Sequence, residues 1–166
     1  MSGLNVGVIG IGNPHYALTV IGSLACFYPE RPWRLRLWDD DAELAELYYQ
    51  VSERVWGAGR TGAIVEVVGT IAETVRDAQR VIMMVDHPAS PAYTWTEDAL
   101  QTQESRVLSL IHPRKGWESL APALPREEGE RVSLLHKANR LASGDEDPAP
   151  WLWNFERSPI RQWLES

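Results

Sequence analysis

Short apolar segments alternate with helical patterns along this chain, and this alternation limits the fold more than any other feature of the sequence. Most of the segments are continuous runs of Val, Ile and Leu, which is typical of strands buried on both faces. We therefore predict an α/β fold of the Rossmann-like, doubly wound kind, with a mostly parallel sheet of five or six strands, helices on both faces and strand order 3-2-1-4-5-6. Strands are expected at 4–9, 33–38, 63–69, 80–86 and 106–113.

Helical patterns fill the segments between these runs. Asn13 is the expected N-cap of the first helix, and Thr70 with Glu73 forms a capping-box pattern at the start of the third. The segment RVSLLHKAN at 131–139 is left open between a sixth strand and the start of a last helix. The other helices are expected at about 14–27, 39–56, 70–78, 93–103 and 115–124.

Composition indicates one main domain with a distinct C-terminal segment. We expect a Rossmann-like nucleotide-binding domain over 1–142, a polar, Pro-bearing linker over 143–150 and a Trp-rich docking segment over 151–166. The net charge of −7 argues against binding to nucleic acid or to acidic membranes. Cys26 is the single cysteine, no run approaches the ~18 residues of a membrane span, and a cytoplasmic protein is expected.

The loop after the first predicted strand has the composition of a nucleotide-binding turn. Gly10 and Gly12 follow the strand, and Asp39 closes the second predicted strand. In doubly wound sheets such glycines let a pyrophosphate approach the backbone, and the acid accepts hydrogen bonds from ribose hydroxyls. These positions predict a dinucleotide site. The alternative is a tight turn in a Rossmann-like scaffold that binds no ligand.

The start of the following helix departs from the usual pattern. His15 stands where the third glycine of G-x-G-x-x-G would be, and Pro14 has no N–H to offer. The amides of Asn13, His15 and Tyr16 remain as the donors expected to face the ligand. Asn13 and His15 are therefore included with the glycines among the predicted cofactor-binding residues.

The stretch from Leu4 to Asp86 resembles the N-terminal NAD-binding part of family 4 glycoside hydrolases and, more loosely, lactate/malate dehydrogenase-type domains. Gly10 and Gly12 match the glycines of the family's turn, and Asp39 and Asp41 match its Asp-x-Asp run. The resemblance implies NAD as cofactor. Family members also carry a large second domain with metal-binding Cys and His, for which this chain has no evident counterpart. Glycoside hydrolysis is not implied.

All four histidines, His15, His87, His112 and His136, follow predicted strands. Since ligands bind outside the carboxyl ends of parallel strands, His15 and His87 are candidates for acid–base catalysis in one crevice. Equally, histidine suits a strand end for purely structural reasons. No spacing among these residues predicts a metal site. Asp86 is expected to meet the nicotinamide-side ribose or to cap the loop that follows it.

The sequence thus predicts a stand-alone NAD(H)-binding protein that serves as a regulatory or accessory subunit. The alternatives are a small NAD-dependent oxidoreductase whose pocket a second subunit completes, and a ligand-free scaffold. NAD is expected over NADP, because Asp39 would repel a 2′-phosphate and no Arg follows it closely.

The Trp-rich segment 151–166 carries more aromatic surface than a disordered tail would. Trp151, Trp153 and Phe155 alternate at strand spacing, and a short helix is expected from Ser158 onward. The segment either folds back on its own sheet or docks on a second subunit. Docking is favoured, which predicts a homodimer through this segment.

Overall fold

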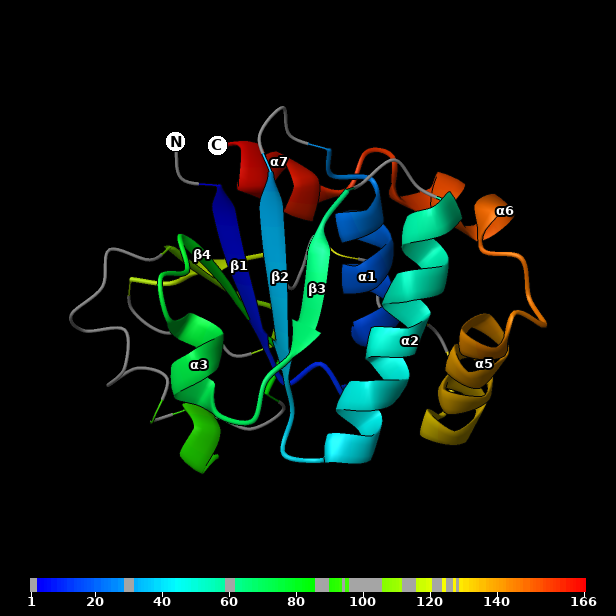
Figure 1. The fold of residues 1–166 in the computed structure, drawn as a ribbon, viewed down its shortest axis with the longest axis horizontal. Coiled ribbons are helices and arrows are strands. Elements are labelled where there is room, and N and C mark those ends of the chain that lie inside the picture. Colours follow the sequence, from blue (N-terminus) through cyan, green and yellow to red (C-terminus); the bar gives the residue numbers. More distant parts are fainter. Residues whose placement is uncertain are drawn as a thin grey trace.

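A computed structural model describes residues 3–28, 32–58, 62–85, 90–93, 95, 106–111, 116–120, 124, 127 and 129–166. Its centre is a six-stranded sheet in the order β3-β2-β1-β4-β5-β6, in which every strand pair is parallel (Figure 1). Both the predicted fold class and the predicted strand order are confirmed. The strands are β1 Leu4–Ile9, β2 Trp33–Trp38, β3 Ile64–Val67, β4 Arg80–Met83, β5 Arg106–Ser109 and β6 Glu118–Ser119.

Helices lie on both sides of this sheet, as expected of parallel strands with apolar side chains on both faces. α1 and α2 cover one face, α3 lies against the other, and α5 packs along the outside of α2 (Figure 1). The helical elements are α1 Ala17–Ala25, α2 Ala42–Ala58, α3 Ile71–Val75, α5 Arg131–Ser143, α6 Ala149–Leu152, the 3₁₀ turn η1 Trp153–Phe155 and α7 Pro159–Glu165. Among the described helices, none is long and apolar enough to cross a membrane.

Successive residues of the central strand β1 serve two separate cores. Val6 and Val8 belong to the larger core beneath α1 and α2, whereas Ile9 joins the smaller core beneath α3. Each of the three is at most 1% exposed. Side chains alternate between the two faces of a strand, so one apolar run supplies both cores.

The sequence-based helix at 115–124 is wrong in part. Glu118 and Ser119 form β6, which pairs with β5 through Leu108 and Ser109. Backbone pairing at the sheet edge therefore overrides the local helical pattern. The open segment 131–139 is helical and belongs to α5. The helix expected at 93–103 lies largely outside the described residues.

The capping pattern predicted for the third helix is present. The Thr70 hydroxyl accepts a hydrogen bond from the Glu73 amide at 3.1 Å, and the Glu73 carboxylate accepts one from the amide of Gly69, also at 3.1 Å. These two bonds satisfy amides that have no partner within the helix. The prediction for α3 is confirmed, although the helix is only five residues long.

The C-terminal segment folds back on its own chain, which was the alternative to the favoured docking on a second subunit, and the homodimer stays a prediction. Ile160 and Trp163 of α7 are buried with the α1 core. The Ser158 hydroxyl donates to the Ser23 hydroxyl of α1 at 2.7 Å, and both side chains are buried. The side chains that were to form an interface thus complete the chain's own core, and Trp153 is 79% exposed.

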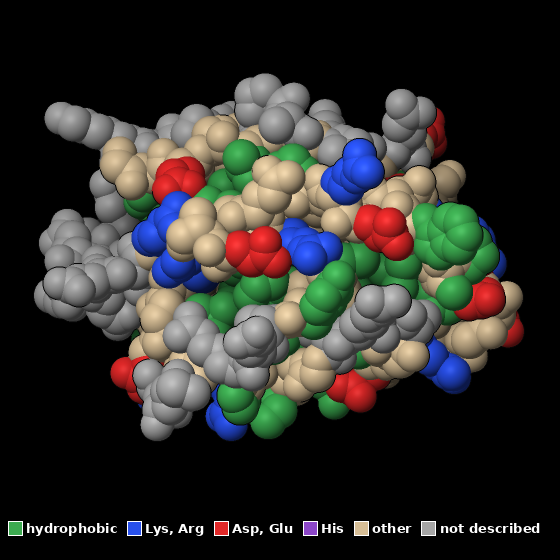
Figure 2. Space-filling model, turned by 90° about the horizontal axis from the view of Figure 1, so that it is seen from above, with side chains coloured by type: hydrophobic (Ala, Val, Ile, Leu, Met, Phe, Trp, Pro, Cys, Tyr) green, Lys and Arg blue, Asp and Glu red, His purple; other side chains and the backbone are tan. Residues whose placement is uncertain are grey.

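Two local expectations in this region also change. Trp151 and Phe155 lie on successive helical turns rather than in a strand, and their rings meet edge to face at 4.8 Å. The predicted linker is a short turn in which Gly144 adopts a left-handed conformation (φ 85°) and closes α5. Seen from the end that carries α7, hydrophobic side chains are interspersed with acidic and basic ones (Figure 2).

Candidate functional site

A pocket of about 330 Å³ lies at the carboxyl ends of β1, β2 and β4. The strand order reverses between β1 and β4, and ligands of doubly wound sheets bind at this switch point. In Figure 1 these strand ends lie toward the bottom, beside the start of α2. Described residues that line the pocket are Gly10, Gly12, Asn13, Pro14, Trp38, Asp39, Asp40, Asp41, Leu44, Met84, Val85, Ser90 and Arg131.

Both glycines of the turn are required by close approaches. Gly10 has φ of 87°, and a Cβ at this position would come within 3.1 Å of the Met84 carbonyl carbon. A Cβ on Gly12 would lie 2.7 Å from Oδ2 of Asp39. The turn therefore needs glycine for its own geometry, independently of any ligand.

Asp39 joins the end of β2 to the glycine turn. Its Oδ2 accepts a hydrogen bond from the Gly12 amide at 2.7 Å, and its Oδ1 accepts one from the Asp41 amide at 2.9 Å. Burial raises the pKa of the Asp39 carboxyl above its usual value, against the lowering effect of these two bonds; the charges of Asp40 and Asp41 raise it further. Each oxygen retains a lone pair that a ribose hydroxyl can use.

The neighbouring acid has a different task. Asp41 precedes the first residue of α2, and its Oδ1 accepts hydrogen bonds from the amides of Glu43 and Leu44 at 3.0 and 3.2 Å. This is N-capping, which satisfies helix amides and places a negative charge at the positive end of the helix. The Asp-x-Asp run thus has one residue that holds the turn and one that caps α2.

The amides of the turn correct one expectation. The sequence left the N–H groups of Asn13, His15 and Tyr16 to face a ligand, but all three are donated within the turn. Pro14 has none. The amides of Gly10 and Ile11 donate to the Trp38 carbonyl, and the Gly12 amide donates to Asp39 Oδ2. The Asn13 amide donates to the Gly10 carbonyl, and the His15 amide to Asn13 Oδ1. The amides of Tyr16 and Ala17 both donate to the Asn13 carbonyl.

Asn13 is the residue that organises this turn. It is 6% exposed, and its side-chain nitrogen donates to the Met84 carbonyl at the end of β4, at 3.0 Å. The Asn13 carbonyl accepts hydrogen bonds from the amides of Tyr16 and Ala17, at 3.3 and 2.8 Å, and the regular helix α1 begins at Ala17 rather than at Pro14. The prediction of Asn13 as N-cap is therefore wrong: Tyr16 is the N-cap of α1, and the Asn13 side chain instead joins the turn to the end of β4.

Of the four histidines, His15 and His136 are among the residues that the structure describes, and neither lines the pocket. His15 is partly buried and is not among the described residues that line it; its carbonyl accepts a hydrogen bond from Glu127 at 3.0 Å. His136 was expected past a strand, but it is an exposed residue of α5, so that expectation is wrong. Asp86, His87 and His112 lie outside the described residues. In the part of the chain that is described, no cluster of residues suits a metal ion.

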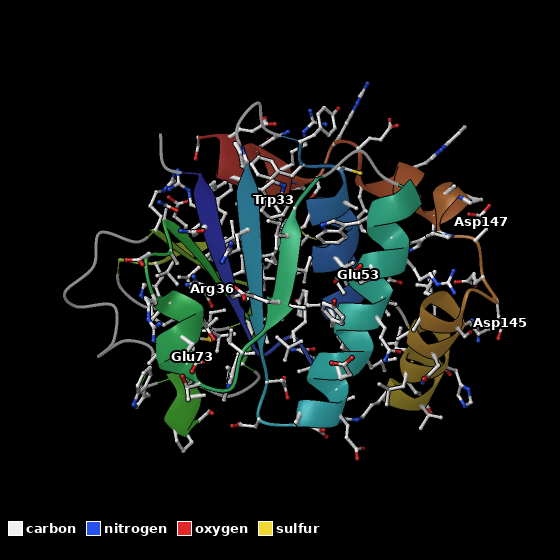
Figure 3. The ribbon with its side chains drawn as sticks, in the orientation of Figure 1. Trp33, Arg36, Glu53, Glu73, Asp145 and Asp147 are labelled. Atoms are coloured by element: carbon white, nitrogen blue, oxygen red, sulfur yellow. The ribbon has the colours of Figure 1, made fainter. Side chains whose placement is uncertain are left out.

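Two arginines of β2, Arg34 and Arg36, face away from the pocket. The Nε of Arg36 donates to Glu66 at 3.2 Å and an Nη1 donates to the Glu73 carbonyl of α3, also at 3.2 Å. Arg34 lies 3.5 Å from Glu66. Figure 3 shows Arg36 between the sheet and α3, with Glu73 nearby. These cations are therefore paired on the α3 side of the sheet.

Arg131 is the pocket residue that the sequence did not reveal. It is the first residue of α5 and lines the pocket together with Asp39, although the two are far apart in the chain. Burial raises the pKa of Tyr48 to about 12, while the charge of Arg131 lowers it and that of Asp39 raises it. Arg131 reaches the pocket only because α5 packs on α2, so no local sequence motif could have indicated it.

The comparisons with known proteins agree with this architecture. No protein-family model and no curated protein matches the chain. Among solved structures, the chain is similar to a 6-phospho-beta glucosidase from Thermotoga maritima with NAD and glucose-6-phosphate, at TM-score 0.55 and 14% identity over 68% of this chain and 34% of the other. It is also similar to a 6-phospho-alpha-glucosidase from gut microorganisms with NAD and Mn²⁺, at TM-score 0.53 and 14% identity over 68% and 33%.

A third similar structure is lplD of Bacillus subtilis, described as a glucosidase. It matches at TM-score 0.57 and 17% identity, over 72% of this chain and 38% of the other. The chain spans about a third of the length of these proteins. The resemblance noted in the sequence is therefore confirmed for the fold.

Proposed function

We propose that this chain binds NAD(H) in the pocket at the β1/β4 switch point. The observation that carries the proposal is the meeting of Gly10, Gly12 and Asp39 at this pocket. Asp39 would accept hydrogen bonds from the adenosine ribose, and the diphosphate would lie beside the glycine turn. Two of the similar structures were solved with NAD, which supports the same cofactor here.

NAD is proposed in preference to NADP. Asp39, Asp40 and Asp41 line the pocket together, so a 2′-phosphate at the ribose would meet several carboxylates. Arg131 lines the same pocket, contrary to the expectation that no arginine is near. Its single positive charge does not outweigh three negative ones, and like charges placed together disfavour binding.

The role proposed is that of a nucleotide-responsive regulatory or accessory subunit. Among the described residues that line the pocket, the only groups able to transfer a proton are the carboxyls of Asp39, Asp40 and Asp41, of which Asp39 is assigned to the ribose and Asp41 caps α2. A small oxidoreductase completed by a second subunit is the alternative, and Asp86 and His87 would then be its candidate residues. A cytoplasmic location fits Cys26, a lone thiol whose pKa is raised, mainly by burial.

Calorimetric titration of the full chain with NAD, NADH, NADP and ADP-ribose tests the proposal. We expect Asp39→Asn to weaken NAD about 10-fold or more, because an amide cannot accept from both ribose hydroxyls and from two backbone amides. Glu53→Gln is the matched control: it also removes one negative charge, from an exposed position on α2 (Figure 3). No heat and no thermal shift with any of the four ligands would leave the ligand-free scaffold as the better description.

A further inference from the structure

A bound dinucleotide places two negatively charged phosphates beside the glycine turn. In most proteins of this architecture, free amides at the start of the first helix meet that charge. Here the amides from Gly10 to Ala17 are all donated within the protein, apart from Pro14, which has none. The Gly12 amide is held most tightly, at 2.7 Å from a carboxylate. The backbone of the turn is therefore expected to bind phosphate weakly.

The charges around the turn disfavour phosphate binding further. Asp39, Asp40 and Asp41 line the pocket, and each would repel a phosphate. The one cation among the described lining residues is Arg131. Without it, the pocket would present only negative charge to the most negative part of the ligand.

Arg131 is held at the pocket from two directions. α5 packs along α2, and the segment that precedes α5 is attached to the turn by the hydrogen bond from the Glu127 amide to the His15 carbonyl at 3.0 Å. Arg131 lines the pocket together with Pro14 of the glycine turn and Leu44 in the first turn of α2. Arg131 therefore shares the pocket with the glycine turn and with Asp39, the acid proposed to bind the ribose.

The guanidinium of Arg131 is also uncommitted. Within the described part of the chain it makes no hydrogen bond or ion pair, whereas Arg34 and Arg36 are both paired with Glu66. The residue before it, Glu130, gives α5 no side-chain cap. A planar guanidinium can bind two phosphate oxygens at once, which a backbone amide cannot do.

We propose that Arg131 is the diphosphate-binding residue of this pocket. It binds the phosphates in place of the amides of the glycine turn, which are already donated within the protein. This inference rests on the proposed binding of NAD(H). It assigns the phosphate contact to a residue outside the β1–α1–β2 unit, so that binding requires α5 to be docked on α2.

Full-length wild type, Arg131→Gln, Arg131→Lys and Arg140→Gln are titrated with NAD, NADP and ADP-ribose, and thermal shifts are measured with adenosine, which has no phosphate. Arg140 is the matched control, because it lies on the same helix at its opposite end and carries the same charge. We expect Arg131→Gln to weaken NAD and ADP-ribose by about 10- to 100-fold, the range of a charged hydrogen-bond pair. Arg131→Lys keeps part of the affinity, and Arg140→Gln and the adenosine shift are unchanged.

Added salt supplies a second readout that is independent of folding. The affinity of wild type for ADP-ribose falls as ionic strength rises, since the ions screen the attraction between guanidinium and phosphate, and this dependence is weaker in Arg131→Gln. Wild-type binding of NAD that Arg131→Gln leaves unaltered would overturn the inference and leave the proposed function intact. Loss of NADP binding alone would assign Arg131 to a 2′-phosphate, which also overturns it. Failure of wild type to bind either ligand would overturn both.

Discussion

Gly22 lies in the middle of α1 and faces the ring of Phe155, which comes from the C-terminal segment. A Cβ on Gly22 would lie 2.5 Å from Cδ2 and 2.6 Å from Cε2 of that ring. Phe155 is 5% exposed, and its ring is also held by the edge-to-face contact with Trp151. The ring cannot move aside freely, so Gly22→Ala forces either the ring or α1 to shift.

Two opposing effects decide the stability of Gly22→Ala. Alanine favours a helix over glycine by about 1 kcal/mol. Overpacking a closed core costs about 1–3 kcal/mol, and the approach of 2.5 Å is well inside normal carbon–carbon contact. We expect a net loss of about 1 kcal/mol in the free energy of unfolding.

Without the Phe155 ring, Gly22→Ala should raise the free energy of unfolding instead of lowering it. Phe155→Ala alone costs about 3–5 kcal/mol, within the total stability of about 5–15 kcal/mol of an ordinary domain. In that background the methyl group of Gly22→Ala enters vacant space, and only the helical preference of about 1 kcal/mol in its favour remains. The double-mutant cycle therefore has an interaction energy of about 2 kcal/mol.

Urea unfolding followed by tryptophan fluorescence measures all four proteins, because no tryptophan is changed. Gly57→Ala is the control: nothing lies within 4 Å of its added Cβ in α2, so it should not destabilise the protein. The midpoints should not depend on protein concentration, since the contact is within one chain. An equal loss from Gly22→Ala with and without Phe155 would refute the packing of this segment on α1.

Four further predictions concern the pocket and α3. Gly12→Val should abolish NAD binding in calorimetry and leave the circular dichroism of a folded domain, because its Cβ meets the Asp39 carboxylate at 2.7 Å; unchanged affinity would make the turn purely structural. NAD affinity should fall as the pH is lowered toward the raised pKa of Asp39, since the protonated acid loses an acceptor, and Asp39→Asn should remove this dependence. The same raised pKa means that the contribution of Asp39 to stability is largest below pH 3.8 and is lost as the pH rises through its value in the folded protein, which urea unfolding of wild type against Asp39→Asn would show or refute. Thr70→Ala should lower the free energy of unfolding by about 1 kcal/mol through loss of the cap on α3, and an effect near zero in thermal denaturation would contradict the 3.1 Å bond.

Local sequence was sufficient for the elements whose residues interact with their near neighbours. The run at 4–9 is a strand because it is apolar on both faces, and it forms β1 with the predicted bounds. Thr70 and Glu73 are three residues apart, so their capping bonds depend only on local geometry. Gly10, Gly12 and Asp39 were found because the turn and the strand end that carry them follow from the same alternation.

Tertiary structure decided what depends on residues far apart in the chain. The edge pairing of Glu118 and Ser119 with β5 cannot be seen in their own sequence, and it overrides a helical pattern. The aromatic surface of 151–166 required burial, and only the structure shows that Phe155 is buried against α1, with its ring beside Gly22.

The chemistry of the pocket divides in the same way. Sequence alone predicted that Gly10, Gly12 and Asp39 meet at one end of the sheet, because neighbouring parallel strands have their carboxyl ends side by side. The donation of the Gly12 amide to Asp39, and the arrival of Arg131 from α5, arise only when β1 meets β2 and α5 packs on α2. The local pattern therefore fixes which residues lie at the site. Which of their amides and carboxylates are still able to bind a ligand depends on the hydrogen bonds that they make with distant segments of the chain.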